Sequence, residues 1–306
     1  MSIPTLLLYG ANSPLGRRLT QALSPRSSEV RVMAADPLAA GALRAAAHTA
    51  DAVINAAMGT PADIVRAAER LTEALRGAPV AKRLVQVSSM TVYGDATGLC
   101  DVTAPPRGPL GAYAAAHAAA EALLRAFPQT VVLRPGVEYG PDCAAWSGRI
   151  ARWLQARRVG DLGAAGDGYC NLVFIDDLVR AVLSAAQAPA AGGRIFNVAM
   201  RNPPTWNEYL IGFGVALGAV PVRRVTRRRL AIETKLLAPP LKVAELTLGR
   251  AALIRQHLPP AIPSSFRRLC SQEIRLVVDD AEAVLGLTWT PLPVGLQAAA
   301  AAYGQP

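Results

Sequence analysis

Short apolar runs alternate with amphipathic stretches along the first half of the chain. The run over residues 5–9 is apolar almost throughout and ends at a glycine, which is typical of a strand buried on both faces. Similar runs predict further strands over residues 29–34, 51–57, 83–88 and 130–133. Between them, apolar positions at helical spacing predict helices over residues 15–23, 62–76 and 111–121. Strands that alternate with helices predict an α/β fold with a doubly wound parallel sheet of the Rossmann type.

This regular alternation ends near Pro141. Beyond it we expect a helix over residues 146–157, a strand over 172–175, a helix over 177–187 and a strand over 194–198. From Pro203 onwards, prolines, arginines and short amphipathic helices dominate. The sequence therefore predicts a first domain of residues 1–141, to which residues 171–199 return, and a smaller C-terminal substrate-binding domain of residues 142–170 and 200–306.

A glycine turn follows the first predicted strand and opens the first predicted helix. It reads Gly10-Ala-Asn-Ser13-Pro-Leu-Gly16. A dinucleotide's pyrophosphate binds at such a helix N-terminus, where glycines let the backbone approach it. Ser13 replaces the middle glycine, but it is small and its hydroxyl can donate to a phosphate. Glycines at this spacing also make an ordinary tight turn, yet their place between strand and helix favours a nucleotide site.

An acid, Asp36, ends the second predicted strand about 20 residues further on, where an acid would accept hydrogen bonds from the adenosine ribose. It would also repel a 2′-phosphate, which favours NAD over NADP. Because Pro37 follows at a typical first-turn position, Asp36 would also serve as a helix cap.

Three polar side chains stand out in an alanine-rich helix, GAYAAAHAAAE, that begins at Gly111. Tyr113, His117 and Glu121 are spaced four apart and therefore share one face of the helix. They form either a solvated stripe or part of a site. Ser89, in the loop VSSMTVYG after the fourth strand, would bring a hydroxyl near the Tyr113 phenol, and such a pair can hold and protonate a substrate C–O group during hydride transfer.

Together with VVLRPGVEYGP (residues 131–141) and NLVFIDDLVRA (residues 171–181), these motifs resemble the extended short-chain dehydrogenase/reductases, the NAD-dependent epimerase/dehydratase family. The resemblance runs from Thr5 to about Val198 and implies NAD as cofactor. It assigns catalysis to Ser89, Tyr113 and His117, the cofactor to Gly10, Ser13, Leu15, Gly16, Asp36, Ala56, Ala57, His117 and Pro135, and the substrate to Thr91, Arg267 and Arg268.

The chain departs from the family pattern at His117, where the family has a lysine that holds the nicotinamide ribose and lowers the pKa of the tyrosine. Histidine is mostly neutral at pH 7. We therefore expect the pKa of Tyr113 to stay nearer its ordinary value and carbonyl reduction to survive better than alcohol oxidation. The short interval between Asp36 and Asp51 holds only one helix, so we expect the sheet to lack one edge strand of the family.

Composition narrows the possible partners. The net charge is +10, but the arginine runs at residues 223–224, 227–229 and 267–268 are short and carry no alternating aromatics, which argues against nucleic acid.

Four scattered cysteines, with no histidine cluster, argue against a metal site and for a reducing, cytoplasmic location. We expect no signal peptide and no membrane span. The apolar segment of residues 236–254 would allow a peripheral membrane contact, but two ordinary amphipathic helices are the preferred interpretation. The partner is thus a small molecule, with a homodimer left open.

Met90 and Thr91 follow Ser89, where the family's 4,6-dehydratases have an acid pair, so dehydration by that route is disfavoured. The sequence hypothesis is an NAD-dependent oxidoreductase or epimerase of a secondary alcohol or ketone, with a nucleotide sugar as the first guess at substrate. Two alternatives remain: a reductase of a hydrophobic alcohol, like a hydroxysteroid dehydrogenase, and a non-catalytic dinucleotide-binding protein.

Overall fold

The computed structural model describes residues 5–24, 31–35, 38–78, 82–104, 111–241 and 260–304. The chain divides into two compact units. The first consists of Met1–Gly136, Val173–Arg201 and Leu276–Trp289, and the second of Val137–Leu172, Asn202–Arg275 and Thr290–Pro306. Residues 276–289, which the sequence analysis placed in the substrate-binding domain, are thus grouped with the first unit.

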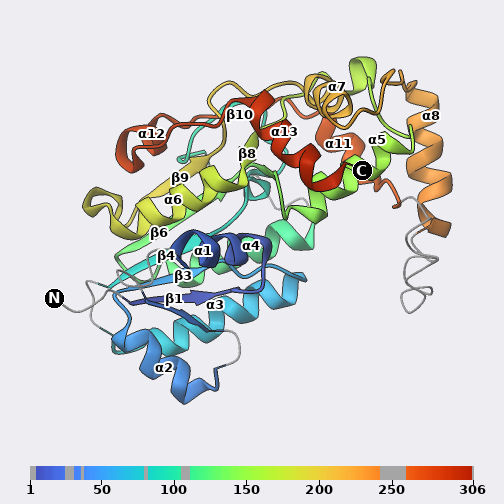
Figure 1. Cartoon of the computed structure of the whole chain (residues 1–306). Helices are drawn as coiled ribbons and strands as arrows, with labels where there is room; N and C mark the ends of the chain where they lie inside the picture. Colours follow the sequence, from blue (N-terminus) through green and yellow to red (C-terminus); the bar gives the residue numbers. More distant parts are fainter. Residues whose placement is uncertain are drawn as a thin grey trace. The chain divides into compact units, whose positions relative to one another are not determined.

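A six-stranded parallel sheet forms the centre of the first unit (Figure 1). Its strands, in spatial order, are β2 (Arg31–Ala34), β1 (Thr5–Tyr9), β3 (Ala52–Asn55), β4 (Arg83–Val87), β6 (Thr130–Pro135) and β9 (Ile195–Val198). The register pairs Leu7 with Val53 and Val85 with Val131, so apolar side chains lie next to one another across the sheet. The predicted α/β, doubly wound parallel fold is confirmed.

The edge of this sheet next to β1 is β2, and no described strand lies beyond it. A single helix, α2 (Ala40–Thr49), occupies the chain between β2 and β3. The sheet therefore has the reduced edge that the short interval between Asp36 and Asp51 predicts.

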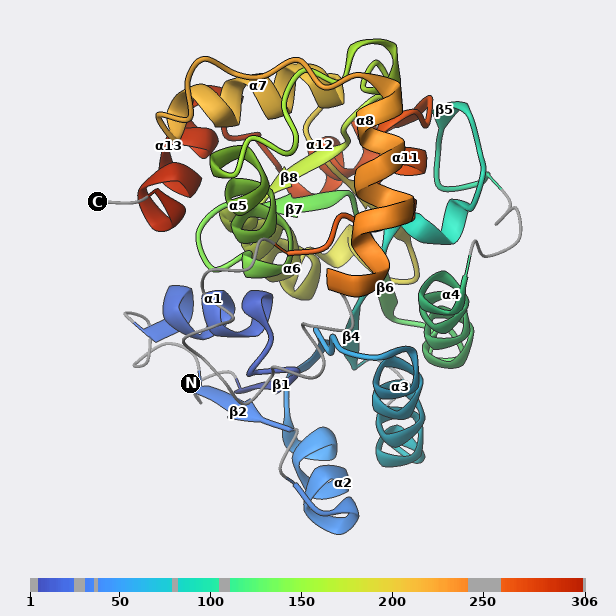
Figure 2. The ribbon, with the colours of Figure 1, turned by 90° about the vertical axis from the view of Figure 1, so that its right-hand side faces the viewer.

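Helices cover both faces of the sheet (Figures 1 and 2). The helices α2, α3 (Pro61–Leu75) and α4 (Ala112–Leu124) pack side by side on one face, while α1 (Pro14–Leu23) and α6 (Ile175–Gln187) pack together on the other. The apolar stripe of α3 buries Ile64, Leu71 and Leu75 against strand residues such as Leu7 and Val53. On α4, small alanines face the same core, which lets the helix lie close to the sheet.

Several short elements of the chain were not predicted from the sequence. They are the 3₁₀ helices η2 (Met90–Tyr93), η4 (Gly163–Ala165) and η5 (Pro189–Ala191), the strands β5 (Gly98–Cys100), β7 (Val137–Tyr139) and β10 (Ile274–Leu276), and the helix α12 (Asp279–Leu285). The predicted strand at residues 172–175 forms as β8 (Leu172–Phe174), but it lies in a two-stranded sheet outside the main one.

The second unit is mainly helical. Its helices are α5 (Arg149–Gln155), α7 (Trp206–Ala216), α8 (Arg227–Ile232), α11 (Ser264–Cys270) and α13 (Leu292–Tyr303), with π-helical turns at η3 (Ala144–Gly148) and η6 (Glu233–Leu237). Aromatic side chains form its core, since the Phe266 ring packs edge-on against both Trp153 and Trp206. The predicted helix over residues 146–157 is thus a π turn followed by α5, and most of the apolar segment 236–254 lies outside the described residues.

The four cysteines are all buried and none forms a disulfide. Cys100 lies in the first unit, while Cys143, Cys170 and Cys270 lie in the second. Burial raises the pKa of the Cys170 and Cys270 thiols well above the ordinary value. Among the described helices, none is both long and apolar enough to cross a membrane, and the described residues contain no metal-binding group of histidines, cysteines and acids.

Candidate active site

The glycine turn brings the end of β1 and the start of α1 into close contact. Gly10 has a φ of +86°, and a Cβ on it would lie 2.3 Å from the Ala56 carbonyl oxygen. A Cβ on Gly16 would lie 2.0 Å from the Gly10 carbonyl oxygen. Both positions therefore require glycine, because the blocking atoms belong to the backbone and cannot move aside.

Ser13 is the N-cap of α1. Its hydroxyl oxygen accepts a hydrogen bond from the Gly16 N–H at 2.9 Å, so its own proton is available to a ligand. Pro14, at the first helical position, has no N–H, and the Leu15 N–H lies too early in the helix to have an intrahelical acceptor. The Ser13 hydroxyl and the Leu15 N–H are the donors that this turn would offer a phosphate.

The adjacent loop after β3 is held by buried amides. The Ala56 N–H donates to the Tyr9 carbonyl at 2.9 Å, and the Ala57 N–H donates to the Asn55 side chain at 3.2 Å. Asn55 in turn donates to Gln86 on β4 at 2.7 Å. Ala56 and Ala57 thus lie beside the glycine turn, at the carboxyl end of the sheet, and their contact with a cofactor stays a prediction.

Asp36 lies outside the described residues. Arg70 of α3 was missed by the sequence analysis: its guanidinium donates to the Tyr9 hydroxyl at 3.0 Å and to the Leu38 carbonyl. It therefore ties the chain just after Asp36 to the end of β1. No sequence pattern links Arg70 to residues that lie so far from it along the chain.

Ser89 follows β4 and caps η2. Its hydroxyl oxygen accepts two hydrogen bonds from Thr91, one from the backbone N–H at 3.2 Å and one from the side-chain hydroxyl at 3.0 Å. A serine oxygen has two acceptor lone pairs, so the Ser89 proton points elsewhere and is available to a substrate oxygen. Thr91, a predicted substrate-binding residue, therefore orients the Ser89 hydroxyl.

Tyr113 and His117 form an edge-to-face aromatic pair on α4. The two rings meet edge to face with their centroids 4.6 Å apart. Tyr113 is 39% exposed, whereas His117 is only 2% exposed and neither of its ring nitrogens has a hydrogen-bond partner in the structure. Burial lowers the pKa of His117 to about 4, although the Glu121 charge opposes this shift. His117 is therefore a neutral imidazole at pH 7, with a donor and an acceptor both unused.

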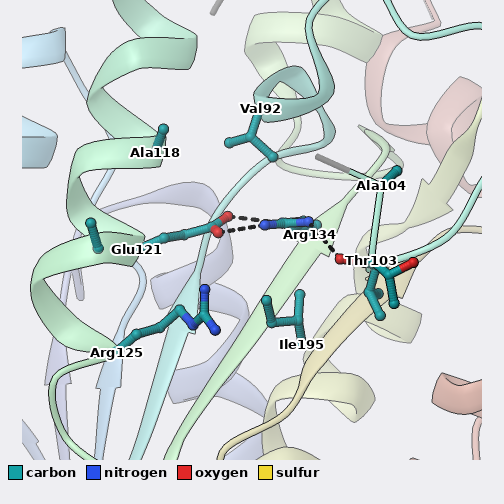
Figure 3. A pocket seen from close by; sticks show the side chains of 10 residues that line it. Val92, Thr103, Ala104, Ala118, Glu121, Arg125, Arg134 and Ile195 are labelled. Carbon is teal, nitrogen blue, oxygen red and sulfur yellow. Dashed lines mark hydrogen bonds and ion pairs between the residues drawn. The ribbon is translucent and has the colours of Figure 1, made fainter. Parts of the chain in front are cut away.

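Glu121, the third member of the stripe, is buried and lies in a polar network rather than in solvent. It pairs with Arg134 of β6 through two hydrogen bonds of 3.0 and 2.7 Å (Figure 3). It also accepts a 2.5 Å hydrogen bond from Ser88, the residue before Ser89. Arg134 extends the network to Tyr93, whose hydroxyl donates to Asn197 of β9. The solvated-stripe interpretation is therefore wrong for His117 and Glu121.

This network fixes α4 to the carboxyl ends of β4 and β6. Burial acts to lower the pKa of Arg134, but its bonds to Glu121 outweigh that effect and raise the pKa, so Arg134 stays charged. Burial also raises the pKa of Tyr93 to about 12. Because Ser88 and Glu121 are joined, the helix that carries Tyr113 and the loop that carries Ser89 are held by one network.

The other residues predicted to bind cofactor or substrate are Pro135, Arg267 and Arg268. Pro135 is the last residue of β6 and is buried. Arg267 and Arg268 lie exposed in the last turn of α11, in the second unit. Their role in binding substrate stays a prediction.

A dinucleotide fits the residues of the first unit. The glycine turn ends in a helix N-terminus, and the unpartnered His117 imidazole would find partners in ribose hydroxyls. The model of the NAD dependent epimerase/dehydratase family matches residues 6–199. The chain belongs to this family. Its members bind NAD or NADP, and the extended short-chain dehydrogenase/reductase fold is the one seen here.

Solved structures of this epimerase/dehydratase fold match the whole chain at low identity. A UDP-glucuronic acid 4-epimerase from Bacillus cereus, in complex with UDP-glucuronic acid and NAD, is 16% identical with a TM-score of 0.71, and 98% of each chain is covered. MoeE5 in complex with UDP-glucose and NAD is 21% identical with a TM-score of 0.70, covering 97% of each chain. RMD from Pseudomonas aeruginosa, complexed with NADPH, is 17% identical with a TM-score of 0.71, covering 98% of this chain and 99% of that one. No curated protein matches this sequence.

Proposed function

We propose that this protein is an NAD-dependent oxidoreductase or epimerase that acts on a secondary alcohol or ketone, with a nucleotide sugar as substrate. Tyr113 is the acid/base, Ser89 positions the substrate oxygen and His117 contacts the nicotinamide ribose. The observation that carries the proposal is the Tyr113–His117 pair: a half-exposed phenol packed on a buried imidazole that has no partner. A buried polar group without a partner costs about 1–3 kcal/mol, and ribose hydroxyls would remove that cost.

The proton chemistry follows from the hydrogen bonds. Ser89 donates its free proton to the substrate oxygen, since Thr91 occupies its lone pairs. Tyr113 gives a proton to that oxygen during carbonyl reduction and takes one from it during alcohol oxidation. NAD, when bound, supplies hydride transfer. Epimerisation uses both directions in turn, with the ketone turned between them.

His117 sets the balance between these directions. Being neutral, it adds no positive charge that would stabilise a Tyr113 phenolate. A neutral phenol donates a proton readily but is a weak base at pH 7, so reduction is favoured over oxidation. This is the chemical consequence of histidine in the place of the family's lysine.

The finer points of the proposal rest on two sequence predictions and on the comparisons. Asp36, beyond β2, favours NAD over NADP. Two of the matched structures hold a UDP-sugar together with NAD, which supports a nucleotide-sugar substrate. Arg267 and Arg268, two exposed positive charges on α11, are the residues that we propose for its diphosphate.

The test is to follow the absorbance of reduced nicotinamide on adding UDP-sugars, with steroid alcohols as a second panel, and to separate the sugar products by chromatography, because epimerisation regenerates NAD and leaves no net change in absorbance. We expect turnover with a UDP-sugar, lost in Tyr113→Phe and retained in Tyr169→Phe. Tyr169 is a matched control because it is also 39% exposed but lies in the second unit. Undiminished turnover in Tyr113→Phe would remove the acid/base role, and tight NAD binding without turnover on either panel would favour a non-catalytic binding protein.

A further inference from the structure

A cavity of about 370 Å³ lies on α4 beside the Glu121–Arg134 pair (Figure 3). Small-molecule sites in proteins begin at about 300 Å³, so the cavity is large enough for a small ligand. Its walls come from α4, from η2, from the chain after β5, from β6 and from β9, and they are formed by Val92, Val102, Thr103, Ala104, Ala118, Glu121, Ala122, Arg125, Arg134 and Ile195. None of these residues belongs to the glycine turn or to the Tyr113–His117 pair.

The charges in this cavity do not cancel. Glu121 neutralises Arg134, whose Nε, Nη1 and Nη2 all donate to protein atoms. Arg125, the C-cap of α4, extends toward this pair (Figure 3). In the part of the chain that the structure describes, the Arg125 backbone N–H donates to the Glu121 carbonyl at 2.9 Å, whereas its guanidinium makes no hydrogen bond or ion pair. One positive charge on the cavity wall is therefore left without a counter-ion.

The rest of the wall offers little hydrogen bonding. The Thr103 hydroxyl donates to Asp101 at 2.6 Å, so its proton is committed. Val92, Ala118, Ala122 and Ile195 present only apolar atoms. An arginine near a helix C-terminus is favoured by the helix dipole, but the dipole does not account for the hollow beside it.

We propose that this cavity binds a small organic anion, with its carboxylate on the Arg125 guanidinium and its apolar body against Val92 and Ile195. An arginine holds a carboxylate through two parallel hydrogen bonds. Val92 and Ile195 would contact the apolar body of the ligand and add a hydrophobic contribution to binding. The site shares no residue with the glycine turn or with the Tyr113–His117 pair, and it does not depend on the proposed function.

The test uses para-fluorobenzoate as the probe and para-fluorobenzamide as its neutral counterpart, both followed by fluorine NMR with the full-length protein. We expect saturable line broadening of the benzoate and none of the benzamide at the same concentrations. Saturating NAD should leave the benzoate signal unchanged, because the two sites share no residue.

Two variants locate the binding. Arg125→Gln should weaken it about tenfold or more, since it removes a charged hydrogen-bond donor. The matched control is Arg31→Gln, an exposed arginine on β2 that carries the same charge change. Ala122→Leu should also abolish binding, because it fills the cavity without removing any side-chain hydrogen bond. Equal binding of benzoate and benzamide, benzoate displaced by NAD, or an Arg125→Gln variant that binds like Arg31→Gln would each overturn the proposal.

Discussion

The neutral state of His117 gives this protein a specific sensitivity to acid. The pKa of the imidazole falls from its ordinary 6.5 to about 4 in the folded chain, mainly because burial disfavours the charged form. Above pH 6.5 the imidazole is neutral in both states and has no effect on stability. As the pH falls below 6.5 the unfolded chain binds a proton that the folded chain does not, so the free energy of unfolding decreases until about pH 4.

The difference between the two pKa values corresponds to about 3 kcal/mol in all, and to about 2 kcal/mol between pH 7.5 and pH 5. Replacing His117 by glutamine, which is neutral at every pH, removes this contribution. Urea unfolding followed by circular dichroism, at both pH values, should therefore show a drop in the free energy of unfolding that is about 2 kcal/mol larger for the parent than for His117→Gln.

Subtracting the two proteins cancels the carboxylates and the other histidines, which titrate in both. The ring-proton NMR signal of His117 gives a second readout in the folded parent, and it should not shift between pH 8 and pH 5. If parent and variant lose the same free energy, or if the signal titrates near pH 6.5, then His117 is solvated and its assignment as a neutral ribose contact fails.

Three further predictions concern the proposed site. His117→Lys should restore a positive charge beside Tyr113, so that the pH–rate curve for alcohol oxidation, with NAD saturating, moves to lower pH; identical curves for the parent and this variant would make His117 a passive contact. Calorimetric titration should show tighter binding of NAD than of NADP, a gap that Asp36→Ala narrows, and equal affinities would remove Asp36 as the selector. Glu121→Gln should lower the free energy of unfolding by about 3–5 kcal/mol, because it leaves Arg134 charged and buried; a loss under 1 kcal/mol in urea unfolding would show that water reaches the pair.

The main sheet was predictable because each of its strands is short and is followed by a helix or a turn. The apolar run at residues 5–9 and the glycine after it contain the whole local signal for a buried strand and a tight turn. The reduced edge of the sheet was equally predictable, since the chain between Asp36 and Asp51 is too short for a helix and another strand. Such features depend on residues that are close together in the sequence, so they can be predicted from the sequence alone.

The Glu121–Arg134 pair and the Arg70 contact were not predictable in this way. Glu121 was noticed as part of a stripe, but its partner comes from the next strand, and only the packed fold shows that both side chains are buried. Arg70 meets Tyr9 and Leu38 from a different helix. A helical spacing defines which residues share a face, whereas burial and partners depend on what packs against that face.

The four cysteine thiols can report how fast each unit of the chain opens. Alkylating reagents and aromatic disulfides react with solvent-exposed thiolate. In the native fold all four thiols are buried, and the raised pKa of Cys170 and Cys270 also keeps these two protonated. Labelling therefore has to wait for a unit to open. One thiol belongs to the first unit and three belong to the second, so mass spectrometry can distinguish the opening of the two units. The rate at which one label is added reports the opening of the first unit, and the rate at which three labels are added reports the opening of the second. A bound dinucleotide would slow the single label alone if it stabilises only the unit that contains the glycine turn.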